Sequence, residues 1–160
     1  GGFPISACVG RASLMDDAWP ASDGEAIHTS TFLGHPVGCA MALENLREIS
    51  RLNLPARANE LGQSCLRALA DIRHPQLRLR PIGLGLMLGL EMRHPDGSPS
   101  TEPALHIMKR MLHRGFILLP EGDAGNVLGI IPPLTITKKQ LQRAVDVLKS
   151  EIENLRLPAT

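Results

Sequence analysis

The sequence predicts a mixed fold of the α/β or α+β class, and the prediction rests on two observations. Short apolar runs of strand length alternate with longer segments in which apolar residues recur at helical spacing. The chain also has 160 residues, of which 43% are hydrophobic, and this is enough for one domain with a substantial core. We therefore expect a small sheet covered by helices.

Composition argues against several classes of function. The net charge is +1, from 17 basic and 16 acidic residues, so no strong field attracts nucleic acid or a membrane surface. Aromatic residues make up only 2% of the chain, which argues against base-stacking platforms for single-stranded nucleic acid. No apolar run is long enough to span a bilayer.

The first half of the chain is expected to be mostly helical. Residues 5–9 form an apolar run rich in small and β-branched residues, which predicts a buried strand, and residues 12–16 can form a helical turn before a loop at 19–24. Pro36 fits the first turn of a helix. Pro55 marks the start of a second helix or a kink, and the apolar face of this segment comprises Leu61, Cys65, Ala68, Leu69 and Ile72.

The second half alternates strands and helices. In residues 77–92 apolar side chains occupy both odd and even positions, which predicts one strand covered on both faces. The glycines among them permit close backbone approach or bulges. Thr137 and Gln140 form a capping box at the start of the last helix. Between residues 77–92 and this last helix we expect an exposed turn at 94–103, a helix at 103–114, and strands at 116–119 and 127–131.

The cysteines indicate a reducing compartment. Cys8, Cys39 and Cys65 are odd in number and have apolar neighbours in the sequence, so we expect buried free thiols. They form neither a disulfide framework nor a zinc motif. Histidines 106 and 113 share a helix at no metal-binding spacing, so no metal site is predicted.

Residues 28–40 have the features of an anion-binding turn. Hydroxyl residues precede Gly34, and Pro36 begins a helix whose free N–H groups and dipole favour an anion. Ser30 and Thr31 could add hydroxyl donors. The alternative is that they only shape the turn and cap the helix, as serine and threonine commonly do, and spacing alone favours this alternative.

The same segment reads His-x-Ser-Thr-Phe-x-Gly-x-Pro-x-Gly-Cys-Ala and resembles the class III family of pyridoxal phosphate (PLP) aminotransferases. In that family a threonine here contacts the cofactor phosphate of the neighbouring subunit. The matching position is Thr31, with Ser30 beside it, whereas the usual asparagine before the proline is His35. The resemblance implies fold type I, pyridoxal 5'-phosphate as cofactor, an amine or amino acid and a 2-oxo acid as substrates, and a cytoplasmic homodimer with shared cofactor sites.

The opening Gly-Gly-Phe-Pro resembles the end of the family's Lys-Gly-x-Gly-Gly-Gly-Phe-Pro motif. The resemblance implies that the Schiff-base lysine lies upstream of Gly1 and that the chain is the C-terminal part of a longer enzyme, inactive alone. Residues 1–76 would then end the large PLP-binding domain with its connecting helices, and residues 77–160 would form the small C-terminal domain. The chain's own lysines are expected at exposed helix positions: Lys109, Lys138, Lys139 and Lys149.

Residues 126–137 carry a second resemblance. Many family members have an arginine three residues before the Pro-Pro pair, where it grips a substrate carboxylate bidentately. Gly129 stands at this substrate-binding position, so we expect a pocket that is roomier and less selective for anions. Arg80 and Arg93 flank the nearby strand and are expected to be solvated.

The resemblance leaves three functions open. The chain could belong to an aminotransferase, to a racemase or aminomutase on the same scaffold, or to a non-catalytic domain derived from it. Product analysis with a labelled amine donor separates transfer from racemisation. A lysine just before Gly1 in the parent sequence would support an enzyme.

Overall fold

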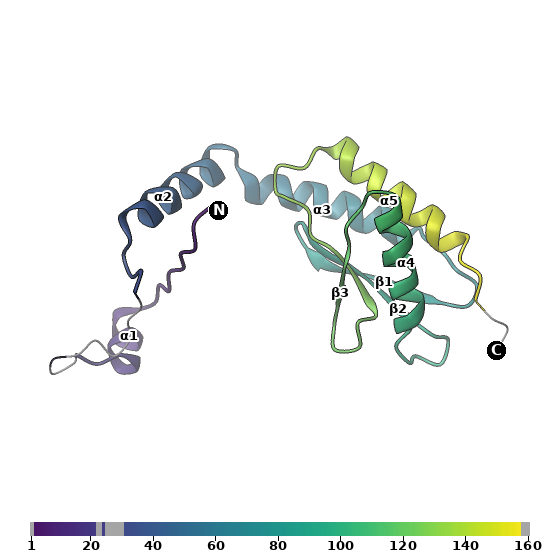
Figure 1. Cartoon of the computed structure of the whole chain (residues 1–160), viewed down its shortest axis with the longest axis horizontal. Coiled ribbons are helices and arrows are strands. Elements are labelled where there is room, and N and C mark those ends of the chain that lie inside the picture. Colours follow the sequence, from purple (N-terminus) through teal and green to yellow (C-terminus); the bar gives the residue numbers. More distant parts are fainter. Residues whose placement is uncertain (1, 22–23, 25–30, 158–160) are drawn as a thin grey trace. The chain divides into compact units, whose positions relative to one another are not determined.

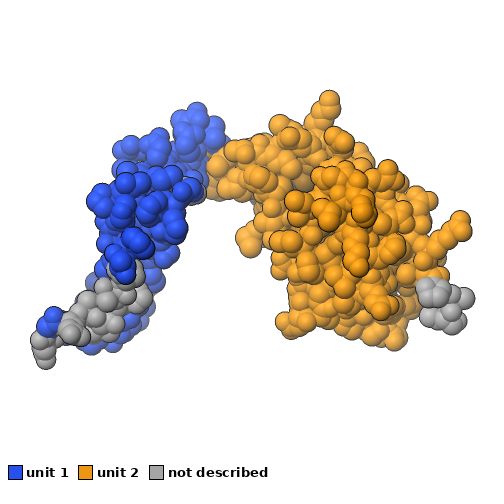
Figure 2. Space-filling view, viewed as in Figure 1, with its two compact units in different colours: residues 1–52 blue, residues 53–160 orange. Residues whose placement is uncertain are grey.

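The structure is a computed structural model that describes residues 2–21, 24 and 31–157. The chain forms two compact units, Gly1–Leu52 and Asn53–Thr160, which are described one at a time (Figure 2). No helix within the described ranges is long and apolar enough to cross a membrane.

The first unit holds α1 (Ala12–Ala18) and α2 (Pro36–Arg51) in its described part. α2 begins at Pro36, as the sequence predicts. The strand expected at residues 5–9 is wrong, because this segment pairs with no described strand and its side chains are exposed. A strand is stable only where its backbone N–H and C=O groups find partners, and the described part of this unit offers no neighbouring strand.

The second unit is built on one antiparallel sheet. Its strands lie in the spatial order β1-β2-β4-β3, so β3 forms one edge (Figure 1). An edge position explains why Pro120 is tolerated inside a strand. The strands are β1 (Arg78–Leu84), β2 (Met87–Arg93), β3 (Leu119–Glu121) and β4 (Val127–Ile130).

The single strand predicted for residues 77–92 is a hairpin. β1 and β2 pair with Leu84 opposite Met87, and the chain reverses between them. Gly83 and Gly85 have φ angles of 130° and 56°, which side chains rarely adopt. Gly85 therefore lies in the turn, and Gly83, in β1 just before it, closely approaches the backbone of Met87.

The strand predicted for residues 116–119 forms later in the chain. Phe116 donates its backbone N–H to the carbonyl of Met111 and so ends the preceding helix instead of pairing in the sheet. Only Leu119–Glu121 pairs with β4. The strand predicted at residues 127–131 is confirmed as β4.

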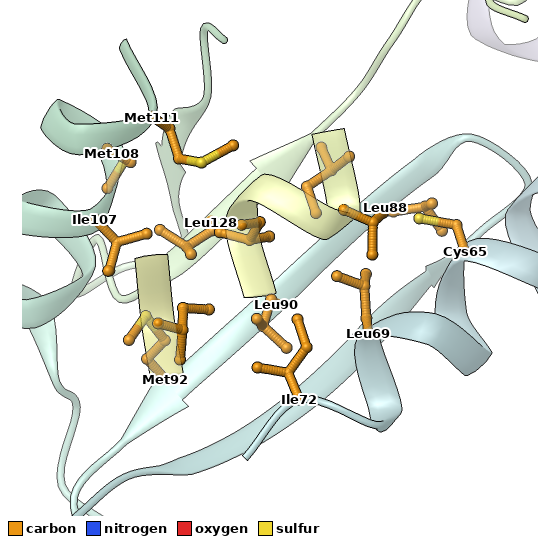
Figure 3. Close-up of a cluster of buried hydrophobic side chains, with 14 of the residues drawn as sticks. Cys65, Leu69, Ile72, Leu88, Leu90, Met92, Ile107, Met108, Met111 and Leu128 are labelled. Atoms are coloured by element: carbon orange, nitrogen blue, oxygen red, sulfur yellow. The ribbon is translucent and has the colours of Figure 1, made fainter. Parts of the chain in front are cut away.

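Helices cover one face of this sheet. α3 (Leu54–Ala70) and α4 (Thr101–His113) contact the strands, and α5 (Lys138–Glu153) contacts both of these helices (Figure 1). The capping box that begins α5 is confirmed, with both Thr137–Gln140 hydrogen bonds present. The core between helices and sheet contains the fully buried Leu69, Leu90, Met92, Ile107, Met111 and Leu128 (Figure 3).

Gly129, the candidate substrate-binding residue, lies on the face of the sheet that is opposite the helices. Successive side chains in a strand point to opposite faces. Leu88, Leu90 and Leu128 belong to the core, so Gly89 and Gly129 face away from the helices. The predicted cover on both faces is confirmed for β2, where residues 88–92 are all buried, whereas β1 is only partly buried.

A buried carboxylate joins α4 to α5. Glu151 is 3% exposed and accepts hydrogen bonds from Nε of Arg110 and, at 2.9 Å, from Nε of Arg114. Burial by itself raises the pKa of Glu151, but the hydrogen bonds from the two guanidinium groups outweigh it and hold the pKa below its ordinary value. The ionised carboxylate therefore stabilises the contact between the helices.

We expect Glu151→Gln to lower the free energy of unfolding by about 1–3 kcal/mol, because an amide cannot satisfy both guanidinium groups. The Arg110 and Arg114 side chains are 36% and 64% exposed, so the loss stays below that of a fully buried pair. Urea unfolding at neutral pH measures the difference.

The pH dependence provides the control for this variant. Because folding lowers the pKa of Glu151, the stabilisation is complete above the unfolded value of 4.5 and is lost as the pH falls through the folded value. The difference between Glu151→Gln and wild type should therefore shrink below pH 4.5. Equal stability of the two proteins at neutral pH would contradict the assignment.

Candidate functional site

The turn before α2 presents Thr31 at the surface. Residues 31–34 form a turn in which Gly34 has a φ of 65°, and the helix follows directly. The N-cap residue is His35, and its side chain makes no capping hydrogen bond to the helix. Thr31 is exposed. Ser30 lies outside the described residues.

His35 fixes this turn by ring contacts. Its ring stacks on Phe3 at a centroid distance of 5.0 Å and meets Phe32 edge-on at 6.2 Å. Its Nδ1 atom is buried and has no hydrogen-bond partner among the described residues. Gly38 lies on the next turn of the helix, where a Cβ atom would come within 2.7 Å of the Phe3 ring. No local pattern predicts this packing, because Phe3 and His35 are distant along the chain.

Gly129 lies in β4, opposite Gly89 of β2 on one side and Leu119 of β3 on the other. It is buried, and a Cβ atom built on it would come within 2.8 Å of Cγ and 3.3 Å of Oε1 of Glu121. The Glu121 side chain therefore lies over this glycine and occupies part of the space that a side chain at residue 129 would take. The sequence analysis missed Glu121, since its position depends on the register between β3 and β4.

An ion-pair cluster lies on the same face of the sheet. Glu91 is 6% exposed and accepts hydrogen bonds from Arg80 at 2.7 Å and Arg93 at 2.9 Å. These two guanidinium groups lower the pKa of Glu91, with Arg80 the larger cause. The two arginine side chains are 69% and 43% exposed, as expected, and each also forms an ion pair with the buried Glu91.

The chain's lysines all lie at exposed positions on helices. Lys109 is on α4, Lys138, Lys139 and Lys149 are on α5, and each is exposed to solvent. This confirms the expected placement. A lysine that serves as a nucleophile is usually enclosed in a site, and these positions are open to solvent.

The cysteines are free, as predicted, but only Cys65 is buried. Burial raises the pKa of the Cys65 thiol to about 11, so it is inert at neutral pH. Cys8 and Cys39 are exposed, so the expectation of three buried thiols is wrong for these two. Their apolar sequence neighbours are themselves largely exposed.

A cavity of the second unit is separate from these residues. It has a volume of about 640 Å³ and lies beside the start of α4, lined among others by His94, His106 and Arg156. None of Thr31, Gly129 and Glu121 lines it. No group of three or more histidine, cysteine or acidic side chains gathers at metal-binding distance in the described ranges.

Known proteins share this sequence and fold. The family model described as "Aminotransferase class-III" matches residues 1–152. The 4-aminobutyrate aminotransferase GabT of Escherichia coli (strain K12) is 36% identical over 155 residues, which are 92% of this chain and 34% of that protein. A leucine/methionine racemase of Thermococcus litoralis is 34% identical over 158 residues, which are 97% of this chain and 34% of that protein.

Solved structures agree with the sequence matches. A transaminase from the marine bacterium Virgibacillus superposes with a TM-score of 0.72 at 26% identity, covering 81% of this chain and 31% of that chain. The predicted fold class, a mixed α/β part of a fold type I transferase, is therefore confirmed. The chain spans about a third of the length of the curated relatives it matches.

Proposed function

Because the chain belongs to the class-III aminotransferase family, we propose that the complete protein is a PLP-dependent aminotransferase that moves an amino group between an amine or amino acid and a 2-oxo acid. The family match over residues 1–152 carries this proposal. The chain itself belongs to this family, and the proposed activity is that of the complete protein. A cytoplasmic location is part of the proposal, because free cysteines fit a reducing compartment.

PLP supplies the electron sink for the chemistry, and the protein supplies binding and orientation. The described residues fit the phosphate end of this cofactor. Thr31 is exposed in the turn that precedes α2, and the side chain of the N-cap residue His35 makes no capping hydrogen bond. The first N–H groups of a helix and a nearby hydroxyl together suit a phosphate group. We propose that Thr31, with Ser30 beside it, binds the phosphate.

The lysine that carries PLP would lie upstream of Gly1 in the complete enzyme. Support comes from the exposed setting of the chain's own four lysines. We expect the 160-residue chain by itself to form no stoichiometric adduct with PLP that borohydride fixes onto lysine. Visible absorption followed by peptide mapping tests this, and fixation onto one of Lys109, Lys138, Lys139 or Lys149 would refute it.

The complete enzyme would be a homodimer in which Thr31 serves the cofactor of the neighbouring subunit. We expect Thr31→Ala to weaken PLP binding by about 1.5–3 kcal/mol, since a hydrogen bond to a charged group is lost. This corresponds to roughly a tenfold to hundredfold rise in Kd. Equilibrium titration of the PLP-free enzyme measures it. The exposed Thr135→Ala is the matched control, and unchanged affinity in Thr31→Ala would remove Thr31 from the site.

A racemase is the second candidate, because the Thermococcus litoralis relative at 34% identity is a leucine/methionine racemase. The two functions differ in the fate of the amino group. We expect the complete enzyme to move heavy nitrogen from a labelled donor onto a 2-oxo acid, giving one labelled amino acid for each donor consumed. Inversion of a chiral amino acid without movement of the label would support racemisation instead.

A further inference from the structure

We propose that the cavity beside the start of α4 binds a free amino acid with an apolar side chain, as a site additional to the one that performs transamination. The cavity lies wholly within the Asn53–Thr160 unit, and neither Thr31 nor Gly129 lines it. Its volume of about 640 Å³ falls within the range of roughly 300–1,000 Å³ that small-molecule sites occupy. The proposal concerns binding only and therefore does not depend on the proposed activity.

Two walls of the cavity are joined by one buried histidine. Nδ1 of His74 accepts a hydrogen bond from the backbone N–H of Gln76 at 3.2 Å, so the proton of the neutral ring is on Nε2. Nε2 then donates to the carbonyl of Leu155 at 2.9 Å. Gln76 follows α3 and Leu155 follows α5, and both residues line the cavity. The His74 ring therefore fixes these two segments relative to each other.

The third wall is the loop between β2 and α4. Arg93 donates from Nη1 to the carbonyl of Gly97 at 2.7 Å and forms an isolated bridge with Pro99. Within the loop, the Asp96 carboxylate accepts from the backbone N–H and the hydroxyl of Ser98. The cavity is therefore preformed by the fold, and a ligand that enters it does not have to order the loop first.

The cavity presents charges of both signs. Arg156, His94 and His106 line it with hydrogen-bond donors, and the guanidinium group of an arginine matches a carboxylate with two parallel bonds. Glu102 lines the same cavity with a carboxylate of its own. Glu102 and His106 are four residues apart on α4, so they lie on one face of that helix. Within the described ranges, acidic and histidine side chains do not gather closely enough to hold a metal ion.

These charges favour a zwitterion over a simple ion. Glu102 repels a ligand that carries only a negative charge, and Arg156 repels one that carries only a positive charge. Most of the remaining cavity surface is apolar and includes Pro75, Pro99 and Leu157. A ligand that buries an apolar group there gains from the hydrophobic effect. A free amino acid with an apolar side chain combines the carboxylate, the ammonium and the apolar group that these walls match.

The alternative occupant is another part of the complete protein, since the chain spans about a third of the length of its curated relatives. In that case the cavity would be filled in the complete protein. No added amino acid would then bind there, and substitution of the charged residues would alter stability only. The experiment therefore uses the complete protein.

The test measures binding of three probes by equilibrium dialysis: leucine, 4-methylpentanoate, which lacks its ammonium, and 3-methylbutylamine, which lacks its carboxylate. Treatment of the protein with borohydride first fixes the cofactor, so that the active site cannot consume leucine. We expect leucine to bind at least about tenfold more tightly than either analogue, because each analogue loses one charged contact. A 4-methylpentanoate affinity equal to that of leucine would overturn the proposal.

Variants assign the binding to the cavity. Arg156→Gln should weaken leucine binding about tenfold or more, and Glu102→Gln should weaken leucine but not 4-methylpentanoate. Arg67→Gln, at an exposed position on α3 that does not line the cavity, is the matched control. Leucine binding that neither Arg156→Gln nor Glu102→Gln alters would overturn the proposal and leave the proposed function standing.

Chemical modification locates the ligand without a variant. Diethyl pyrocarbonate modifies accessible imidazole rings, and peptide mapping reports each histidine separately. Leucine should slow the modification of His94 and His106 severalfold, because both line the cavity. His113, exposed near the end of α4 and outside the cavity, should react at an unchanged rate. Equal rates at His94 and His106 with and without saturating leucine would contradict binding in the cavity.

Discussion

Replacing Gly62 with alanine should destabilise the Asn53–Thr160 unit by about 3 kcal/mol, near the upper end for overpacking. Gly62 is buried on α3, and a Cβ atom there would overlap the carbonyl oxygen of Gly85 in the hairpin turn. Both atoms belong to elements with fixed backbones, so no flexible side chain can move aside. α3 would have to shift away from the sheet that it covers.

Whether Gly62→Ala lowers or raises stability shows whether α3 packs closely on the hairpin turn. Glycine to alanine inside an unobstructed helix stabilises by about 1 kcal/mol, because alanine loses less backbone entropy. Gln63→Ala, at the neighbouring exposed position on α3, should therefore be neutral or slightly stabilising. Thermal unfolding followed by circular dichroism measures both variants. A midpoint for Gly62→Ala at or above that of wild type would show that α3 does not pack on the hairpin as described.

The second large effect is a change of donor preference in the complete enzyme. Gly129→Arg alone should gain little, because the introduced guanidinium would pair with the carboxylate of Glu121, which lies over this position. Gly129→Arg combined with Glu121→Gln frees that group to bind a substrate carboxylate. We expect the combined variant to raise the kcat/KM ratio of 5-aminopentanoate over pentylamine by about one to two decades, since such a charged contact contributes roughly 1.5–3 kcal/mol.

The single variants are the controls for this prediction. Gly129→Arg and Glu121→Gln should each shift the ratio less than the combined variant does, and the two shifts should not add, because the residues touch. A combined variant no better than Gly129→Arg would show that Glu121 does not interact with residue 129. A wild type that already prefers the amino acid by several decades would place a carboxylate-binding group elsewhere.

Local signals in the sequence identified the helices well. Pro36 predicts the start of α2, and the Thr137–Gln140 capping box predicts the start of α5, because both signals act within one helical turn. The strands were harder, since pairing depends on distant residues. Residues 5–9 look like a strand but have no described partner, and residues 77–92 divide at two glycines with positive φ.

At the candidate site too, local motifs could be recognised in the sequence, whereas contacts between distant strands could not. Thr31 and Gly129 were identified by resemblance to a family, and Thr31 lies exposed where a phosphate could reach it. Glu121 could not be identified, because Phe116 uses its N–H to end α4 and the strand therefore begins later than the apolar run suggests. The pairing of Leu119 with Gly129 then sets the register that brings Glu121 beside the glycine.

The central claim is that this chain supplies a cofactor contact to an aminotransferase dimer. The most direct measurement is the distance between Oγ1 of Thr31 and the nearest phosphate oxygen in a structure of the complete enzyme with PLP bound. We predict a hydrogen bond of about 2.5–3.0 Å to the cofactor held by the neighbouring subunit. A phosphate bound entirely by other residues, with Thr31 facing solvent, would contradict the account.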